Sequence, residues 1–125
     1  MPTTRGADRR RAVVLFVRGP VAAAIDEVRR RWDPVMAGRI DPHVTLVHDI
    51  TDHEAATCRV AALAASTPPV ELTLTHAGCW ADTAAYGVYL GVDDPTGAVH
   101  ALHDALADLE EPRWAGLEFR AHLTL

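Results

Sequence analysis

Two four-residue segments of this chain repeat a pattern of side chains that suits proton transfer. They are His43-Val44-Thr45-Leu46 and His122-Leu123-Thr124-Leu125. Alternate side chains of a β-strand share a face, so each segment presents its imidazole and its hydroxyl together and its aliphatic side chains on the other face. A free imidazole, with a pKa of about 6.5, acts as an acid or a base near neutral pH. A hydroxyl donates hydrogen bonds to anionic oxygens, so the four polar groups suit acid-base chemistry on an anion.

The two segments end similar stretches of chain, residues 12–47 and 86–125. Each stretch begins with an apolar strand pattern and continues through a proline into a helical pattern. Each then contains a tryptophan close to an acidic residue followed by proline, before the motif itself. The copies differ in length by only a few residues, an ordinary loop change. This internal repeat predicts two lobes related by a pseudo-two-fold axis, with the motif strands facing each other across a cleft.

Hydrophobic periodicity predicts the elements that position these motifs. Pro20 suits the first position of a helix, and Val70, Leu72 and Leu74 alternate with polar residues as in a half-buried strand. Strands outnumber those that simple strand-helix-strand alternation needs, which favours an α+β fold with antiparallel pairing. Helices are expected over about residues 20–32, 52–65 and 96–109, and strands over 12–17, 43–47, 70–75, 86–92 and 120–125.

The motifs and the order of elements resemble those of the 2H phosphoesterase superfamily, which is named for two H-x-[ST]-hydrophobic motifs. Its members include 2′-5′ RNA ligase-like proteins and 2′,3′-cyclic nucleotide phosphodiesterases. The resemblance runs from about Ala12 to Leu125 and implies one domain over residues 1–125 with a bilobal α+β fold, outer helices and a central cleft. Family members usually continue for several tens of residues past the second motif, whereas this sequence stops one residue after Thr124. A naturally short member, a fragment, or a domain completed by a second subunit in a homodimer would each explain the difference.

The resemblance implies a metal-independent phosphoesterase without a cofactor. Its partner would be a small nucleotide or an RNA end that carries a 2′,3′-cyclic phosphate or a 2′-5′ phosphodiester bond. By similarity, His43 is the general acid and His122 the general base, while Thr45 and Thr124 hold the phosphate. Ligation and hydrolysis exchange the two histidine roles, so the residues are better defined than the roles.

Five further residues are candidates for substrate contacts. Arg120 would project with the second motif on a regular strand, which makes it the first choice for a phosphate contact, ahead of Arg39 and Arg18. Tyr89 lies between two glycines, where open backbone would admit a base or a ribose, although a surface tyrosine is the competing interpretation. Trp80, expected in the loop after the third strand, matches a position that is often aromatic in the family.

The other five histidines have simpler interpretations. His48 would face away from the cleft, His53, His100 and His103 fall on expected helices, and His76 continues the apolar face of the strand before it. Two alternative functions stay open. One is a nucleotide- or RNA-end-binding module without turnover, and the other is a metal-dependent hydrolase that uses His100, His103 and nearby Asp104.

Composition limits the remaining possibilities. The chain has 125 residues, 49% hydrophobic content and a formal net charge of −5, which suits one globular domain and argues against a general nucleic-acid coat protein. No run of about 18 apolar residues indicates a membrane span. The basic residues 1–11 are expected to be flexible. Cys58 and Cys79 suit a reducing compartment as small buried groups, so a cytoplasmic protein is expected.

Overall fold

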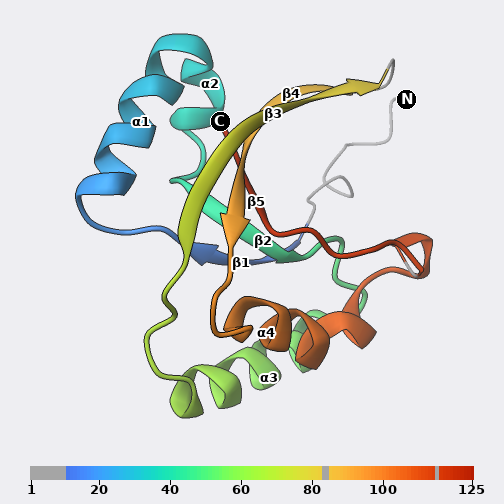
Figure 1. The fold of residues 1–125 in the computed structure, drawn as a ribbon. Helices are drawn as coiled ribbons and strands as arrows, with labels where there is room; N and C mark the ends of the chain where they lie inside the picture. The colour runs from blue at the N-terminus through green and yellow to red at the C-terminus, as the bar shows by residue number, and fades with distance from the viewer. Residues whose placement is uncertain (1–10, 83–84, 115) are drawn as a thin grey trace.

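The computed structural model describes residues 11–82, 85–114 and 116–125 (Figure 1). Most of the segment 1–11, expected to be flexible, lies outside these residues. The described residues confirm the α+β class. The elements are β1 (Val13–Phe16), α1 (Pro20–Trp32), α2 (Pro34–Ala37), β2 (His43–Val47), α3 (His53–Ser66), β3 (Thr73–Asp82), β4 (Ala85–Asp93), α4 (Ala98–Leu106) and β5 (His122–Thr124), with 3-10 turns at Ala107–Leu109 and Pro112–Trp114.

The strands form one antiparallel sheet in the order β1-β2-β5-β4-β3. The two motif strands, β2 and β5, are therefore hydrogen-bonded neighbours in one sheet. The prediction from the repeat, that these strands face each other across a cleft, is wrong in this respect. Strand β5 is paired on both sides, and the backbone N–H of Leu125 donates to the carbonyl of Val88 at 2.9 Å. The second motif is thus held in the interior of the sheet by its own chain.

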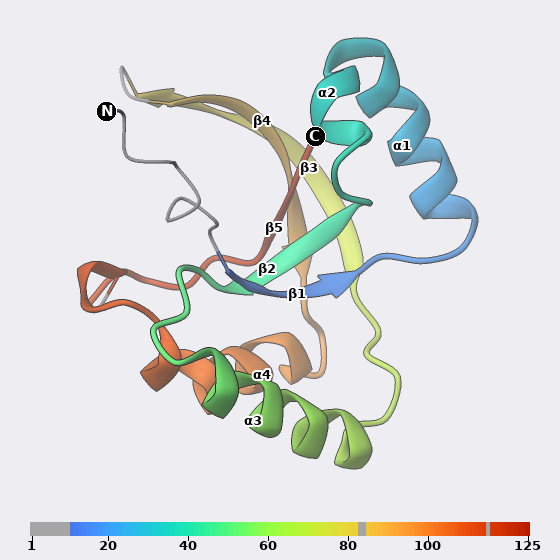
Figure 2. The same ribbon diagram turned by 180° about the vertical axis from the view of Figure 1, so that it is seen from behind.

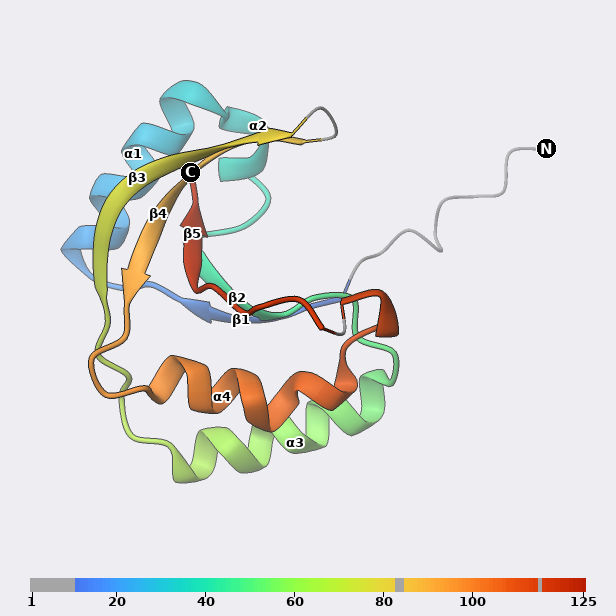
Figure 3. The same cartoon turned by 45° about the vertical axis from the view of Figure 1, so that its right-hand side comes forward.

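The hydrophobic core lies on one face of this sheet. Val44, Leu46 and Leu123, from the two motifs, are at most 2% exposed and join one cluster with Val99 and Leu106 of α4. Helices α3 and α4 lie beneath the sheet in all views, whereas α1 and α2 pack together at the other end of the molecule (Figures 1–3). Burial of the aliphatic motif residues against α4 leaves the histidines and threonines on the opposite face.

Helices α1 and α3 lie within one residue of their predicted bounds, whereas the short helix α2 was not predicted. Pro20 occupies the N-terminal turn of α1, and the side chain of Asp52 accepts a hydrogen bond from Ala55 N–H at the start of α3 at 3.0 Å. Helix α4 is shorter than expected, because the chain tightens into a 3-10 turn after Leu106. None of the helices in the described parts of the chain is both long and apolar enough to cross a membrane.

Strand β3 differs from its prediction in two ways. It begins at Thr73 and continues to Asp82, so Trp80 lies in the strand and not in a loop after it. A β-bulge also interrupts its pairing with β4, since Leu74 pairs with Val92 but Ala77 pairs with Leu90. The extra residue reverses the alternation of side chains along the rest of β3. Trp80 is thereby moved from the core face to the face that carries the histidines.

The expectation that the two cysteines are buried is wrong. Cys58 and Cys79 are free and exposed. Cys58 lies on the outer surface of α3. Cys79 lies in β3 and pairs with Val88 of β4, which is itself 48% exposed.

Asp94, just before α4, supports the start of that helix. Its side chain is 3% exposed, and Oδ2 accepts hydrogen bonds from the backbone N–H and the ring Nδ1 of His100, both at 3.0 Å. Burial raises the pKa of Asp94, but these bonds lower it more, so the pKa lies below its ordinary value of 3.8. The carboxylate therefore stabilises the fold above pH 3.8, and this stabilisation is lost as the pH falls through the lower pKa of the folded state.

We expect Asp94→Asn to lower the free energy of unfolding by about 1 kcal/mol at pH 7, because a neutral amide accepts weaker hydrogen bonds from the helix terminus. Urea unfolding at pH 7 and at pH 3 measures this cost. The difference from wild type should shrink at pH 3, while the neighbouring exposed Asp93→Asn should show little effect at either pH. A cost that grows at low pH would contradict this account of the Asp94 charge.

Candidate active site

The pairing of β2 with β5 places both motifs on one patch of the sheet. Val44 lies opposite Leu123 in this antiparallel pair. The same register sets His43 opposite Thr124, and Thr45 opposite His122, on the face away from α4. Opposite side chains in such a pair have Cβ atoms about 5 Å apart, and diagonal neighbours are about 7–8 Å apart. The two histidines therefore occupy one diagonal of a quartet and the two threonines the other.

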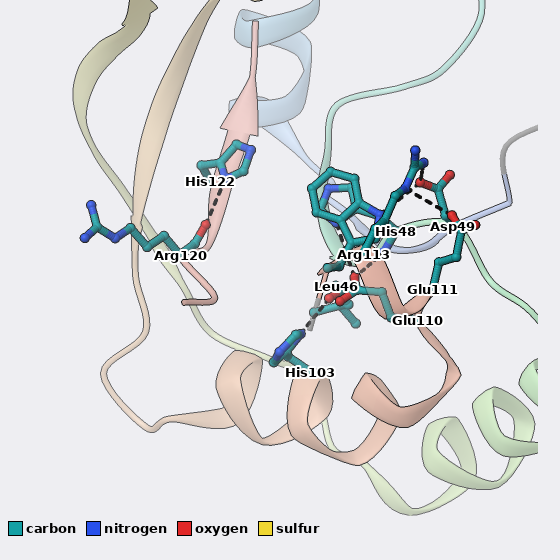
Figure 4. A network of polar contacts seen from close by, with 10 residues as sticks. Leu46, His48, Asp49, His103, Glu110, Glu111, Arg113, Arg120 and His122 are labelled. Atoms are coloured by element: carbon teal, nitrogen blue, oxygen red, sulfur yellow. Dashed lines mark hydrogen bonds and ion pairs between the residues drawn. The ribbon is translucent and has the colours of Figure 1, made fainter. Parts of the chain in front are cut away.

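Both histidine rings are held in the same way by the backbone. The Nδ1 atom of His43 lies 2.8 Å from the carbonyl oxygen of Asp41, and Nδ1 of His122 lies 2.8 Å from that of Arg120 (Figure 4). A carbonyl oxygen only accepts hydrogen bonds, so each Nδ1 carries a proton. Each Nε2 is then left either to accept a proton or, in the charged ring, to donate one. This is the tautomer that an acid-base pair working through Nε2 requires.

The threonine hydroxyls complete the quartet. Thr45 is half-buried and Thr124 is exposed. Neither hydroxyl has a side-chain hydrogen bond to another residue within the described parts of the chain. A hydroxyl donates one hydrogen bond, so both remain able to bind an anionic oxygen placed between the histidines.

An aromatic cluster lies beside His122. The ring of Trp80 is 4.7 Å from that of Tyr89 and 5.1 Å from the imidazole of His122, and Tyr89 is 5.7 Å from the same imidazole. The rings lie over glycines, since a Cβ atom on Gly78 would come within 2.6 Å of Tyr89, and one on Gly87 within 2.6 Å of Trp80. The absence of these two side chains therefore allows the aromatic rings to lie flat beside the quartet.

The structure places a further aromatic residue at the other histidine. Phe16 of β1 lies opposite His43, with ring centroids 6.4 Å apart, and is 47% exposed. The guanidinium of Arg18 is 6.0 Å from the centroid of the Phe16 ring, so a cation lies at this end of the quartet. Sequence analysis missed Phe16. Its place in β1 resembled any apolar strand residue, and only the pairing with His43 distinguishes it.

The model of the 2′-5′ RNA ligase superfamily matches residues 17–125 and so includes both motifs. The chain belongs to this superfamily. No curated protein and no solved structure matches it significantly.

Two of the predicted arginines are not brought to the quartet. The Arg120 guanidinium pairs with Glu118 at 3.0 Å and extends away from the His122 ring (Figure 4). Regular strand structure begins only at His122, so the alternation that would have aligned the two side chains does not reach Arg120. Its backbone carbonyl, not its side chain, contacts the site. Arg39 is exposed in the turn after α2, and the described contacts do not connect its side chain with the motifs.

His48 belongs to a separate cluster that fixes the loop after β2. Its ring stacks on Trp114 at 4.6 Å, and its backbone N–H donates to Glu110 at 2.6 Å. Trp114 Nε1 donates to Asp49 at 3.0 Å, and Arg113 forms an ion pair with the same carboxylate (Figure 4). The hydrogen bond that Arg113 donates to the Asp49 carboxylate raises the pKa of Arg113. These contacts join the end of β2 to the turn at residues 112–114, consistent with a structural role for His48.

The histidines of α4 have structural partners as well. His103 Nδ1 donates a hydrogen bond to the carbonyl of Leu46 at 2.7 Å (Figure 4). Its ring also stacks on Phe119, with centroids 4.0 Å apart. His100 pairs with Asp94 at 3.0 Å. Within residues 11–82, 85–114 and 116–125, no group of three or more His, Cys, Asp or Glu side chains is arranged to hold a metal ion. The predicted alternative of a metal site on this helix therefore gains no support from the geometry.

A cavity of about 1020 Å³ lies between β1, α3 and the segment before β3. Its lining includes Leu15, Leu46 and Leu74, whose side chains belong to the core side of the sheet. The histidine quartet is on the opposite face. Phe16 and Arg18, at the β1 end of the quartet, also line this cavity, so it borders the candidate active site along β1.

Proposed function

We propose that this protein is a metal-independent phosphoesterase that hydrolyses 2′,3′-cyclic phosphates, or related 2′-5′ phosphodiester bonds, of RNA ends or nucleotides. One observation carries the proposal. His43 and His122 lie on one diagonal of a sheet-borne quartet, and both have Nδ1 tied to a backbone carbonyl. Membership in the 2′-5′ RNA ligase superfamily supports the same chemistry.

In the proposed reaction, Nε2 of His122 takes a proton from water as the water oxygen bonds to phosphorus. The bond from phosphorus to the leaving ribose oxygen breaks, and the protonated Nε2 of His43 gives that oxygen its proton. The hydroxyls of Thr45 and Thr124 donate hydrogen bonds to the non-bridging oxygens, where negative charge increases in the transition state. After the step His122 has gained a proton and His43 has lost one, so exchange of one proton with solvent restores both rings for the next turnover.

The diagonal arrangement suits this displacement. The attacking and leaving oxygens lie on opposite sides of the phosphorus, so the base and the acid must reach the phosphate from two sides. Diagonal neighbours about 7–8 Å apart leave room for a phosphate group between the rings. The threonines occupy the other diagonal and approach the oxygens that stay bound to phosphorus.

The direct test is hydrolysis of 2′,3′-cyclic AMP and of a short RNA with a cyclic-phosphate end, both in EDTA. We expect turnover that EDTA does not lower. The pH dependence of kcat/KM should be bell-shaped, because one imidazole must be neutral and the other charged. A folded protein that binds these ligands without turnover would instead be a nucleotide- or RNA-end-binding module. Activity that EDTA abolishes would overturn the metal-independent mechanism.

In the proposed complex, Trp80 and Tyr89 stack on the base of the substrate, which their position beside His122 supports. Stacking on an aromatic side chain contributes about 1–3 kcal/mol per base, so Trp80→Ala should raise KM for the cyclic nucleotide by roughly tenfold. Steady-state kinetics measures this change. The control is Trp32→Ala on α1, where the ring is 76% exposed and KM should stay at the wild-type value. An unchanged KM in the Trp80 variant would show that the cluster does not bind the base.

A further inference from the structure

The β-bulge in β3 brings two more polar side chains to the face of the quartet. Thr75 and His76 together oppose the single residue Gly91 of β4. A Cβ atom on Gly91 would lie 2.7 Å from the Thr75 hydroxyl and 3.0 Å from Cε1 of the His76 ring. Both side chains therefore fill the space over Gly91. Regular alternation from Leu74 predicted His76 on the core face, and the bulge overturns that prediction.

Gly91 lies next to the quartet of His43, Thr45, His122 and Thr124. It lies directly opposite His122 in the pairing of β4 with β5, and Tyr89 lies opposite Thr124 in the same pairing. The Gly91 Cβ position is thus about 5 Å from that of His122. The imidazole of His76 reaches over Gly91 and flanks His122 on the side away from Thr45.

The chemistry of the Thr75–His76 pair differs from that of the motif histidines. Nδ1 of His76 lies 3.3 Å from the Thr75 hydroxyl oxygen, which both donates and accepts, and both residues are exposed. If the hydroxyl donates to Nδ1, then Nε2 of the ring carries an outward N–H. If Nδ1 donates instead, the hydroxyl proton turns outward. In either tautomer the pair presents a hydrogen-bond donor to the solvent, which suits an acceptor-only group such as a phosphate oxygen.

We propose that Thr75 and His76 form a second phosphate subsite that selects an oligonucleotide end over a mononucleotide. The inference rests on the proposed function and names its substrate class. The Trp80–Tyr89 cluster, on the same two strands, offers a stacking surface for a base. The nucleotide whose base stacks there carries a phosphodiester on its 5′ side in an oligonucleotide. This phosphodiester would lie along β3 and β4, where Thr75 and His76 donate hydrogen bonds to it. A mononucleotide with only the cyclic phosphate leaves this subsite empty.

The test compares kcat/KM for a 2′,3′-cyclic mononucleotide with that for a dinucleotide ending in a 2′,3′-cyclic phosphate. His76→Ala should lower the dinucleotide value by about tenfold and change the mononucleotide value less than about twofold, since a hydrogen bond to a charged group is lost only with the longer substrate. His76→Gln, which keeps an N–H donor, should recover most of the loss. His53→Ala, at the exposed start of α3, is the matched control.

Equal losses on both substrates, or no loss on either, would overturn the subsite. Measurements of ligand binding, which need no turnover, distinguish a failure of the subsite from a failure of the proposed function. Tryptophan fluorescence gives Kd for a dinucleotide with an uncyclised 3′-phosphate and for the matching mononucleotide. If the wild type hydrolyses neither cyclic substrate, a dinucleotide preference that His76→Ala removes would still support the subsite. If the wild type binds the dinucleotide no more tightly than the mononucleotide, the second phosphate subsite is rejected.

Discussion

Replacing His43 or His122 with alanine is expected to lower kcat for hydrolysis of a cyclic-phosphate end by about 10²- to 10⁴-fold, the usual contribution of a positioned acid or base. Each variant removes one of the two Nε2 atoms that act on either side of the phosphate in the proposed mechanism. Steady-state kinetics measures kcat, and a single-turnover experiment with enzyme in excess isolates the rate constant of the chemical step, which should fall by a similar factor. The double variant should lose much less than the product of the two single losses, because residues that act as a unit are not additive.

Two controls make this result specific. His53→Ala removes an exposed histidine from α3 and should leave kcat unchanged. His43→Asn keeps a polar side chain at the start of β2 but removes proton transfer, so it should be as inactive as the alanine variant. A folded His43 or His122 variant that retains more than about a tenth of wild-type kcat would refute the two-histidine mechanism.

Leu123→Ala is expected to lower the free energy of unfolding by about 2–5 kcal/mol, as for other large-to-small substitutions in close-packed cores. Leu123 has no exposed surface and lies between Val44 and Leu90, its partners on the neighbouring strands. Unfolding in urea measures the loss. Because whole domains are stable by only about 5–15 kcal/mol, this variant should show a clearly lower midpoint.

The matched control for the core is Leu117→Ala. That side chain is 64% exposed, and its removal should change stability by less than about 0.5 kcal/mol. Leu123 lies between His122 and Thr124 in β5, so its loss also affects the quartet when the variant unfolds. Activity of this variant should therefore be measured at temperatures and urea concentrations well below its unfolding transition. A loss under about 1 kcal/mol at Leu123 would mean that the core beneath the quartet is less tightly packed than the structure indicates.

The sequence alone determined the features that depend on local geometry. Alternation along a strand is a property of the extended backbone, so a histidine and a threonine two positions apart share a face wherever the strand lies. Helix α1 was equally predictable, since Pro20 and the apolar spacing after it act within a few residues. The two H-x-[ST]-hydrophobic motifs also predicted membership in the superfamily, which the family match confirms.

The tertiary structure decided everything that depends on pairing between distant strands. The register of β2 against β5, set by packing of Val44 and Leu123 in the core, turns two separate motifs into one quartet. Strand pairing likewise creates the β3 bulge, which carries His76 and Trp80 to the face of the sheet that holds the quartet. The late start of β5 turns Arg120 away from it. A single inserted residue or a shifted strand end inverts which face a side chain occupies, and such events follow from contacts between strands and not from the local sequence.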